Sequence, residues 1–193
     1  MDFLNLIKKN RSYRGFDEKK PVSEEALLKL VECARFAPSA VNLQPLKYYL
    51  SADEETNAKI FPLTRWAGKL AHKMTLPFPG HHPTAFIIIC TDANIQPNPS
   101  AAAMDIGIAA QTMLLAATDM GLGGCMIAAF NKEDMAKALS LPENLKPMLT
   151  LALGVPDEEI ILEDACGSID YYRDENGTHR VPKRTLDELI VHP

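Results

Sequence analysis

A chain of 193 residues with 47% hydrophobic and 23% charged residues has the length and composition of one ordinary globular domain. Its net charge of −5 and its scattered Lys and Arg residues argue against a nucleic-acid-binding protein, which usually carries a basic surface. The four cysteines lie far apart without a CxxC pair, so the sequence predicts neither a zinc knuckle nor a redox dithiol, and a reduced cytoplasmic protein fits. Cys33 and Cys90 sit in apolar patterns, so we expect both to be buried.

The first half of the chain predicts helices and strands separated by two polar loops. The spacing of its apolar residues indicates helices over residues 2–9, 23–36, 53–60 and 65–74, and strands over residues 46–51 and 84–91. The Pro-rich stretch 76–83 has no such spacing. Its composition suits either a substrate lid or an ordinary surface loop.

The second half continues the alternation and ends in a hairpin. It predicts helices over residues 100–120, 131–139 and 185–191, strands over residues 122–130 and 148–154, and a turn at Asn176-Gly177 within residues 170–181. The helix over residues 100–120 is apolar round most of its circumference. We expect it to be buried in a core or a subunit interface and not to span a membrane, since two acidic residues interrupt it. No repeat or linker appears, so we predict a single domain over residues 1–193.

A basic segment follows the first predicted helix. Arg11 and Arg14 flank Ser12, just before Gly15. The two planar guanidinium groups match the oxygens of a phosphate or a carboxylate, and the Ser12 hydroxyl adds a further donor. Taken alone, so short a motif is equally typical of a solvated basic loop.

A second polar segment, residues 37–45, lies between the second helix and the first strand. Two prolines bracket small, uncharged polar residues; the segment contains Pro38, Ser39, Ala40, Asn42 and Gln44. Its amide and hydroxyl groups suit a flat heterocycle with carbonyl and imide edges. The alternative is a polar connection from helix to strand without a ligand.

Four motifs together resemble those of the FMN-dependent nitroreductase family. They are Arg11–Phe16, Ala37–Pro45, Gly121–Gly124 and Pro182–Arg184, which occur in the family's order and span nearly the whole chain. The resemblance implies an α+β fold of three layers with a central mixed, mainly antiparallel sheet. It also implies a homodimer with two FMN sites at its interface, elements exchanged between subunits, and NADH or NADPH as electron donor.

The resemblance also implies the residues that bind FMN. They are Arg11, Ser12, Arg14, Pro38, Ser39, Ala40, Asn42, Gln44, Met126, Ile127, Ala128, Lys183 and Arg184. Arg11 and Ser12 hold the phosphate or the ribityl chain, Arg14 lies near the pyrimidine edge, and the basic pair near the C-terminus reaches the phosphate. The segment 126–128 lies by the ring face, and part of the polar segment comes from the second subunit.

Chemistry argues in the same direction as the resemblance. A flavin carries the hydride itself, so no catalytic side chain is expected, and the sequence has no Ser-His-Asp or Cys-His arrangement. His81-His82 lacks a matching cluster of ligands, so we predict no metal site. Cations from distant segments of an acidic chain make sense if they converge on one anionic ligand.

The expected reaction is ping-pong hydride transfer from NAD(P)H to an electron-poor acceptor such as a nitroaromatic compound, a quinone or an enone. Three departures from the family's usual residues bear on this: Leu46 replaces an aromatic residue, Asn10 replaces an arginine, and Ala128-Ala129 replaces acidic and glycine residues. Alternatives are a flavin-consuming or dehalogenating relative, a non-catalytic FMN-binding module, or an interaction domain without flavin. We expect neither nucleic acid nor membrane as a partner.

Overall fold

The computed structural model describes residues 2–191 of the chain, which divides into two compact units, Met1–Pro156 and Asp157–Pro193. Each unit has its own β-sheet. The single domain expected over residues 1–193 stays a prediction.

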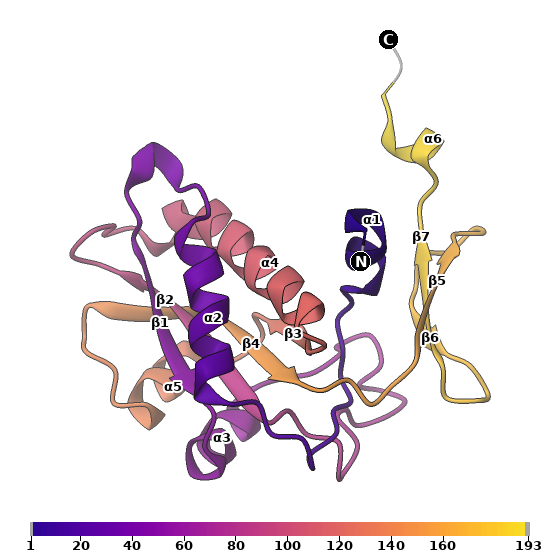
Figure 1. The fold of residues 1–193 in the computed structure, drawn as a ribbon, viewed down its shortest axis with the longest axis horizontal. Coiled ribbons are helices and arrows are strands. Elements are labelled where there is room, and N and C mark those ends of the chain that lie inside the picture. The colour runs from indigo at the N-terminus through magenta and orange to yellow at the C-terminus, as the bar shows by residue number, and fades with distance from the viewer. Residues whose placement is uncertain (1, 192–193) are drawn as a thin grey trace. The chain divides into compact units, whose positions relative to one another are not determined.

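The first unit contains a four-stranded sheet and five α-helices (Figure 1). Its strands are β1 (Leu46–Ser51), β2 (Ala85–Asp92), β3 (Gly123–Ile127) and β4 (Leu145–Gly154). Its helices are α1 (Phe3–Lys9), α2 (Glu24–Arg35), α3 (Glu54–Ile60), α4 (Ala103–Asp119) and α5 (Lys132–Ala138), with 3₁₀ turns η1 (Ala40–Asn42), η2 (Phe61–Leu63) and η3 (Pro99–Ala102). The strand order is β1-β2-β4-β3, and every neighbouring pair is antiparallel.

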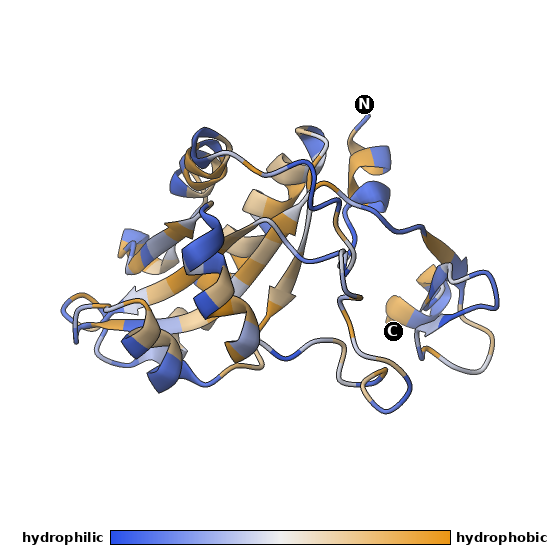
Figure 2. Ribbon diagram, turned by 90° about the horizontal axis from the view of Figure 1, so that it is seen from below, coloured by the Kyte–Doolittle hydropathy of each residue, from blue (hydrophilic) through white to orange (hydrophobic). Residues whose placement is uncertain are grey.

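The central strand β2 explains why the unit has three layers. All eight of its side chains are buried, and alternate ones point to opposite faces of the sheet. Ala85, Ile87 and Ile89 pack with α2 and α4, whereas Phe86, Ile88 and Cys90 pack with α3 and α5. Hydrophobic residues accordingly run along the central strands between the helices (Figure 2). The predicted three-layer α+β fold is confirmed.

Helix α4 packs on α2 along one side and leaves its other side uncovered within this chain. Ala110, Met113 and Ala117 are buried against the core, while Met104 is 72% exposed and Ile108 is 40% exposed. The expectation that α4 is buried all round is therefore met on one face only. Among the described residues, Pro99–Asp119 is the one stretch long and apolar enough to cross a membrane, and half of it is buried, as in a core helix.

Two local predictions are wrong. Residues 65–74 form successive turns and no helix, because Ala67 has a φ of +42°, which breaks helical geometry. Cys33, expected to be buried, is exposed on the outer face of α2, whereas Cys90 is buried in the core, and burial raises the pKa of its thiol to about 12. The remaining predicted helices and strands are present, and the sequence analysis missed strand β5.

The second unit is a small three-stranded sheet followed by a short helix. It consists of β5 (Ile160–Asp164), β6 (Tyr172–Arg173), β7 (His179–Lys183) and α6 (Leu186–Leu189). β7 lies in the middle, parallel to β5 and antiparallel to β6. The predicted hairpin is confirmed: Gly177 has a φ of +81° in the turn, and the Gly177 amide donates to the Asp174 carbonyl.

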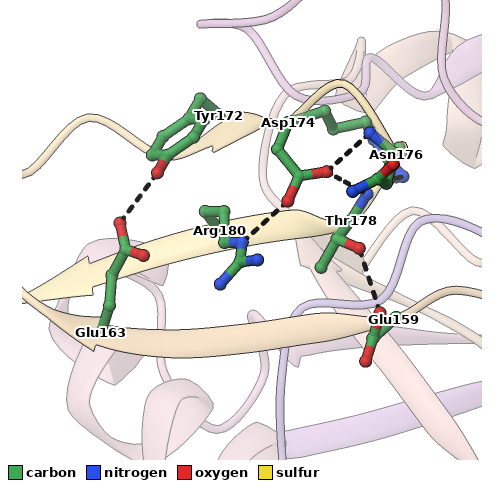
Figure 3. Close-up of polar contacts among 9 residues, drawn as sticks. Glu159, Glu163, Tyr172, Asp174, Asn176, Thr178 and Arg180 are labelled. Carbon is green, nitrogen blue, oxygen red and sulfur yellow. Dashed lines mark hydrogen bonds and ion pairs between the residues drawn. The ribbon is translucent and has the colours of Figure 1, made fainter.

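Polar contacts hold the second unit together (Figure 3). Arg180 Nε donates to Asp174 at 2.9 Å, and the Thr178 hydroxyl donates to Glu159 at 3.0 Å. Arg173 and Glu158 form an ion pair with little solvent exposure. The buried residues described in this unit are the polar Thr178 and His179, so its sheet depends on paired charges more than on an apolar core.

Close packing at Gly124 gives a first testable prediction. A Cβ atom at this position would lie 2.6 Å from Leu114 and 2.9 Å from the Ala152 carbonyl oxygen. We expect Gly124→Ala to lower the free energy of unfolding by about 1–3 kcal/mol, measured by urea denaturation. Gly68→Ala is the matched control, since nothing lies within 4 Å of a Cβ there. Equal stability of the two variants would contradict the packing described.

Candidate functional site

The basic segment lies along the free edge of β3. Ser12 forms a parallel bridge with Gly124, and the Tyr13 amide donates to the Gly124 carbonyl at 3.1 Å. Gly123 permits this approach, because a Cβ there would lie 2.5 Å from the Tyr13 ring. The predicted glycine-rich entry to β3 therefore has a packing role: it lets the segment that carries Arg11 and Arg14 run beside the strand.

Asn10 fastens the basic segment to helix α4. Its Nδ2 atom donates to the Leu114 carbonyl at 2.9 Å and to the Thr118 hydroxyl at 3.0 Å. Its Oδ1 atom accepts from Gln111 Nε2 at 3.0 Å. Asn10 is buried, and both ends of its amide contact α4, so this side chain is used in the protein's own structure.

Arg11 is a partly buried cation. Its Nη2 donates to the Ile7 carbonyl at 2.9 Å, and burial lowers the pKa of its guanidinium, which stays charged at neutral pH. Its Nε is buried, and no acceptor among the described residues reaches that atom. A buried charged donor without an acceptor costs free energy.

Arg14 lies two residues further along the same edge. Its Nη1 donates to the Ser12 carbonyl at 3.2 Å, which curls the side chain back over the segment. Because the bridge between Ser12 and Gly124 is parallel, Arg14 and Met126 each stand two residues beyond it. The structure thus places the basic segment beside β3 at Gly124, and two residues past Arg14 the chain bridges Pro156 at Phe16.

The three predicted residues at the end of β3 differ in what they expose. Met126 and Ala128 are exposed, whereas Ile127 is buried among the residues between the sheet and α5. Alternation along the strand is the reason, since neighbouring side chains point to opposite faces. Ile127 can therefore offer a ligand only its backbone.

The polar segment is tied to the other end of α4. The Ser39 hydroxyl donates to the buried Asp105 carboxylate, and the Ala40 amide donates to the same carboxylate at 3.3 Å. The Gln44 amide donates to Ser39 Oγ at 2.9 Å, which closes the loop on itself. Asp105 therefore holds the segment from inside the fold.

The polar segment has an unusual backbone and projects from the chain. Val41, Asn42 and Gln44 have φ values of +47°, +56° and +52°, in the left-handed region that side chains other than glycine seldom adopt. Val41 is 95% exposed. Strained backbone of this kind is concentrated at functional sites, where surrounding contacts fix it.

A cavity of about 310 Å³ lies behind the polar segment. Pro38, Ser39 and Gln44 line it together with Asp105 and Tyr48. Burial, and then the neighbouring Asp105 carboxylate, raise the pKa of the Tyr48 hydroxyl, which stays protonated and able to donate.

Helix α4 separates the two predicted halves of the site. Asp105 holds the polar segment near its first turn, whereas Leu114 and Thr118 hold Asn10 near its last. The 9 to 13 residues between these positions span about 14–20 Å at 1.5 Å per residue. One chain therefore does not bring the polar segment to the basic segment.

The comparisons with known proteins identify the fold and its family. The model of the family described as "Nitroreductase family" matches residues 7–155, which ends one residue before the first unit does. The chain belongs to the nitroreductase family. The family and the fold predicted from the sequence are therefore confirmed.

The names of this chain's relatives cover several activities. A protein of Methanothermobacter thermautotrophicus, named as an NADH dehydrogenase/NAD(P)H nitroreductase, is 32% identical over 162 residues, covering 82% of this chain and 79% of its own. An FMN reductase [NAD(P)H] of Bacillus subtilis is 26% identical, and the match covers 80% of this chain and 66% of that protein. An iodotyrosine deiodinase of Thermotoga neapolitana is 24% identical, and the match covers 80% of this chain and 88% of that protein.

Among solved structures, a nitroreductase family protein of Clostridium novyi NT superposes on this nitroreductase with a TM-score of 0.66. It is 27% identical and covers 81% of this chain and 86% of its own.

The predicted basic pair near the C-terminus belongs to the second unit. Lys183 ends β7, and Arg184 Nη1 donates to Glu188 at 3.2 Å on the exposed first turn of α6. That this pair converges with the basic segment on one anion stays a prediction for this nitroreductase.

Sequence reasoning missed two structural residues of the site. It treated Asn10 as a lost phosphate contact and Asp105 as an interruption in an apolar helix, whereas each anchors one of the two polar segments. The signal for Asp105 was its position: a carboxylate in an apolar stretch needs a buried polar partner.

The Asn10 anchor gives a second prediction. We expect Asn10→Ala to lower the free energy of unfolding by about 2–4 kcal/mol, because it removes two buried hydrogen bonds and one partly buried hydrogen bond between Asn10 and α4. Urea denaturation at a fixed protein concentration measures the effect. Asn5→Ala is the control, because Asn5 is exposed on α1 and its side chain donates to the Asp2 carboxylate. The anchoring role is wrong if Asn10→Ala unfolds like the wild type.

Proposed function

We propose that this nitroreductase passes hydride from NADH or NADPH to electron-poor acceptors, such as nitroaromatic compounds or quinones, by a ping-pong reaction on FMN. The observation that carries the proposal is the buried Arg11 Nε without an acceptor, in a segment that runs beside the glycine-bearing edge of β3. The family confirms the predicted enzyme class, an NAD(P)H-dependent flavin oxidoreductase with FMN as its cofactor.

The residues at the β3 edge fit a flavin phosphate and ring. Arg11 and Ser12 hold the phosphate or ribityl chain, since the unpartnered Arg11 Nε is a charged donor. Arg14 lies toward the pyrimidine edge, where a cation stabilises the anionic reduced ring and raises its reduction potential. Met126 and Ala128 flank the ring face, and Ile127 contributes its backbone.

FMN, when bound, supplies the hydride chemistry, so the chain needs no acid–base pair of its own. Its residues have three tasks: they hold the phosphate, set the electrostatics at the ring edge, and leave one ring face accessible. Exposed Met126 at the sheet edge suits the last task, because donor and acceptor must occupy the same face in turn.

A second copy of the chain completes the site. Within one chain α4 keeps the polar segment about 14–20 Å from the basic segment, so the polar segment reaches a flavin only in a partner. Phe3 and Leu4 on α1, Met104 and Ile108 on α4, and Val41 in the polar segment are exposed apolar residues that a homodimer interface would cover. In that homodimer Pro38, Ser39, Ala40, Asn42 and Gln44 pack on the partner's flavin.

The proposal also assigns the basic pair of the second unit to the FMN phosphate, as the family resemblance implies. Arg184 is the better candidate, because its planar fork binds phosphate in two-pronged geometry and its present partner, Glu188, is an exposed side chain. Lys183 adds a point charge. We propose a cytoplasmic enzyme whose partners are its second copy and small molecules.

A dehalogenating activity is the second candidate, favoured by the iodotyrosine deiodinase among the relatives. It requires a lid that encloses the halogenated substrate. Release of iodide or bromide from a halogenated tyrosine by the reduced enzyme, faster than reduction of a nitroaromatic compound, would replace the first candidate with this one.

The visible spectrum tests the function directly. We expect the purified protein to be yellow and to lose its visible flavin absorbance when NADH or NADPH is added without oxygen. A yellow protein that neither nucleotide bleaches would favour a binding module. A colourless protein that does not take up FMN would refute the proposal.

Arg14 provides the third prediction. We expect Arg14→Ala to weaken FMN binding by about tenfold, because it removes one charge-assisted contact. The measurement is the dissociation constant of FMN from fluorescence titration. Lys29→Ala is the control, since Lys29 is an exposed α2 cation paired with Glu25. Unchanged FMN affinity of Arg14→Ala would refute the role given to this residue.

Mixing subunits provides the fourth prediction. Arg11→Ala removes the basic half of each site, and Asn42→Ala with Gln44→Ala removes the polar half. If each site takes one half from each subunit, unfolding and refolding the two variants together restores roughly a quarter of the sites, because half the dimers are mixed and each has one intact site. Flavin occupancy and activity measure the recovery. No recovery above either variant alone contradicts the shared site.

A further inference from the structure

A basic segment outside the proposed FMN site remains unexplained. Residues 56–91 contain no Asp or Glu in a chain of net charge −5. Within this stretch Arg65, Lys69, His72 and Lys73 are all exposed. We propose that Arg65, Lys69 and Lys73, called the lid cations below, bind the 2′-phosphate of the electron donor, so that the enzyme uses NADPH in preference to NADH. This inference rests on the proposed function.

The lid cations begin where β3 ends. The Arg65 amide donates to the Ala129 carbonyl at 2.9 Å, and Thr64 forms an antiparallel bridge with Phe130. Met126 and Ala128, proposed to flank the flavin ring, immediately precede these contacts. If the nicotinamide of the donor lies on that ring face, its adenosine half extends beyond the flavin. The lid cations lie next to the end of β3, where that half would pass.

The lid cations are carried by an ordered scaffold. The Trp66 indole donates to the Thr64 hydroxyl at 2.9 Å, and Leu70 is buried. The Leu70 amide donates to the Ala67 carbonyl at 2.7 Å, and the Lys73 amide donates to the Leu70 carbonyl at 2.8 Å. These turns hold the cations in place before a ligand arrives, which reduces the entropy cost of binding.

The lid cations have no acidic residue three or four positions away in the sequence. Elsewhere in the first unit Lys20, Lys29, Arg35 and Lys59 each form an ion pair with an acidic residue three or four positions away. Among the described residues, Arg65 and Lys73 form no ion pair. A phosphate monoester supplies the missing negative charge, and the Arg65 guanidinium can bind it through two donors.

The FMN phosphate is a second phosphate monoester that the lid cations could bind. The geometry favours the 2′-phosphate of NADPH over the FMN phosphate. The phosphate-binding segment meets β3 at Gly124, whereas the lid cations meet the chain at Ala129. Five residues of extended chain, roughly 16 Å, separate these points. The FMN phosphate placed at Arg11 therefore lies at the opposite end of the strand from Arg65.

The test compares two donors on the FMN-loaded enzyme. Anaerobic stopped-flow reduction measures the efficiency with NADPH and with NADH for the wild type, Arg65→Gln and Lys73→Gln. We expect the wild type to prefer NADPH, and each substitution to lower its efficiency with NADPH by about tenfold while changing that with NADH less than about twofold, as for one charge-assisted contact. Lys29→Gln, an exposed cation on α2, is the matched control and is expected to change neither value.

A binding measurement gives an independent readout that needs no turnover. By calorimetry, 2′-AMP should bind the wild type more tightly than 5′-AMP does, and Arg65→Gln should abolish the difference. Equal use of NADH and NADPH by the wild type would overturn the inference. So would weaker FMN affinity in Arg65→Gln with an unchanged donor ratio, since the segment would then hold the flavin phosphate. An enzyme that neither donor reduces would refute the proposed function, while 2′-AMP binding would still decide the inference.

Discussion

The attachment of residues 10–16 to the α4 helix and the β3 edge is the contact on which the candidate site depends. Asn10 forms hydrogen bonds to α4 through both the nitrogen and the oxygen of its side-chain amide. Ser12 pairs with Gly124 of β3, where there is no room for a side chain. Together they hold Arg11 partly out of water with its Nε lacking an acceptor. In the proposed function the FMN phosphate, an anion from outside the chain, offsets the desolvation cost of that cation.

Helix α4 fixes the distance between the basic segment and the polar segment within one chain. It anchors the basic segment near one end and the polar segment near the other, and its rigidity keeps them apart. The same helix leaves Met104 and Ile108 exposed on the face that the core does not cover. In the proposed homodimer, a two-fold partner covers the apolar face and brings the polar segment of one chain to the basic segment of the other.

Charge is distributed unevenly over this acidic chain. In the first unit Lys20, Lys29, Arg35 and Lys59 are paired with acidic residues within a helical turn, and the second unit is held by its own ion pairs. Arg11 lacks an acceptor at Nε, and Arg65 and Lys73 form no ion pair among the described residues. They meet β3 near its opposite ends. Two separate anions, one from the cofactor and one from the donor, fit this arrangement better than one.

The sequence by itself determined the family, the three-layer fold and most of its elements. Four motifs in order identified the family. The distribution of apolar residues located β2 and α4, because a strand buried on both faces is a continuous apolar run and a helix buried against a core has an apolar face. Only the tertiary structure decided the functions of Asn10 and Asp105, the turns at Ala67, and the exposure of Cys33. Those features depend on which distant segments meet: Asn10 contacts residues more than a hundred positions away, and no local pattern records such a partner.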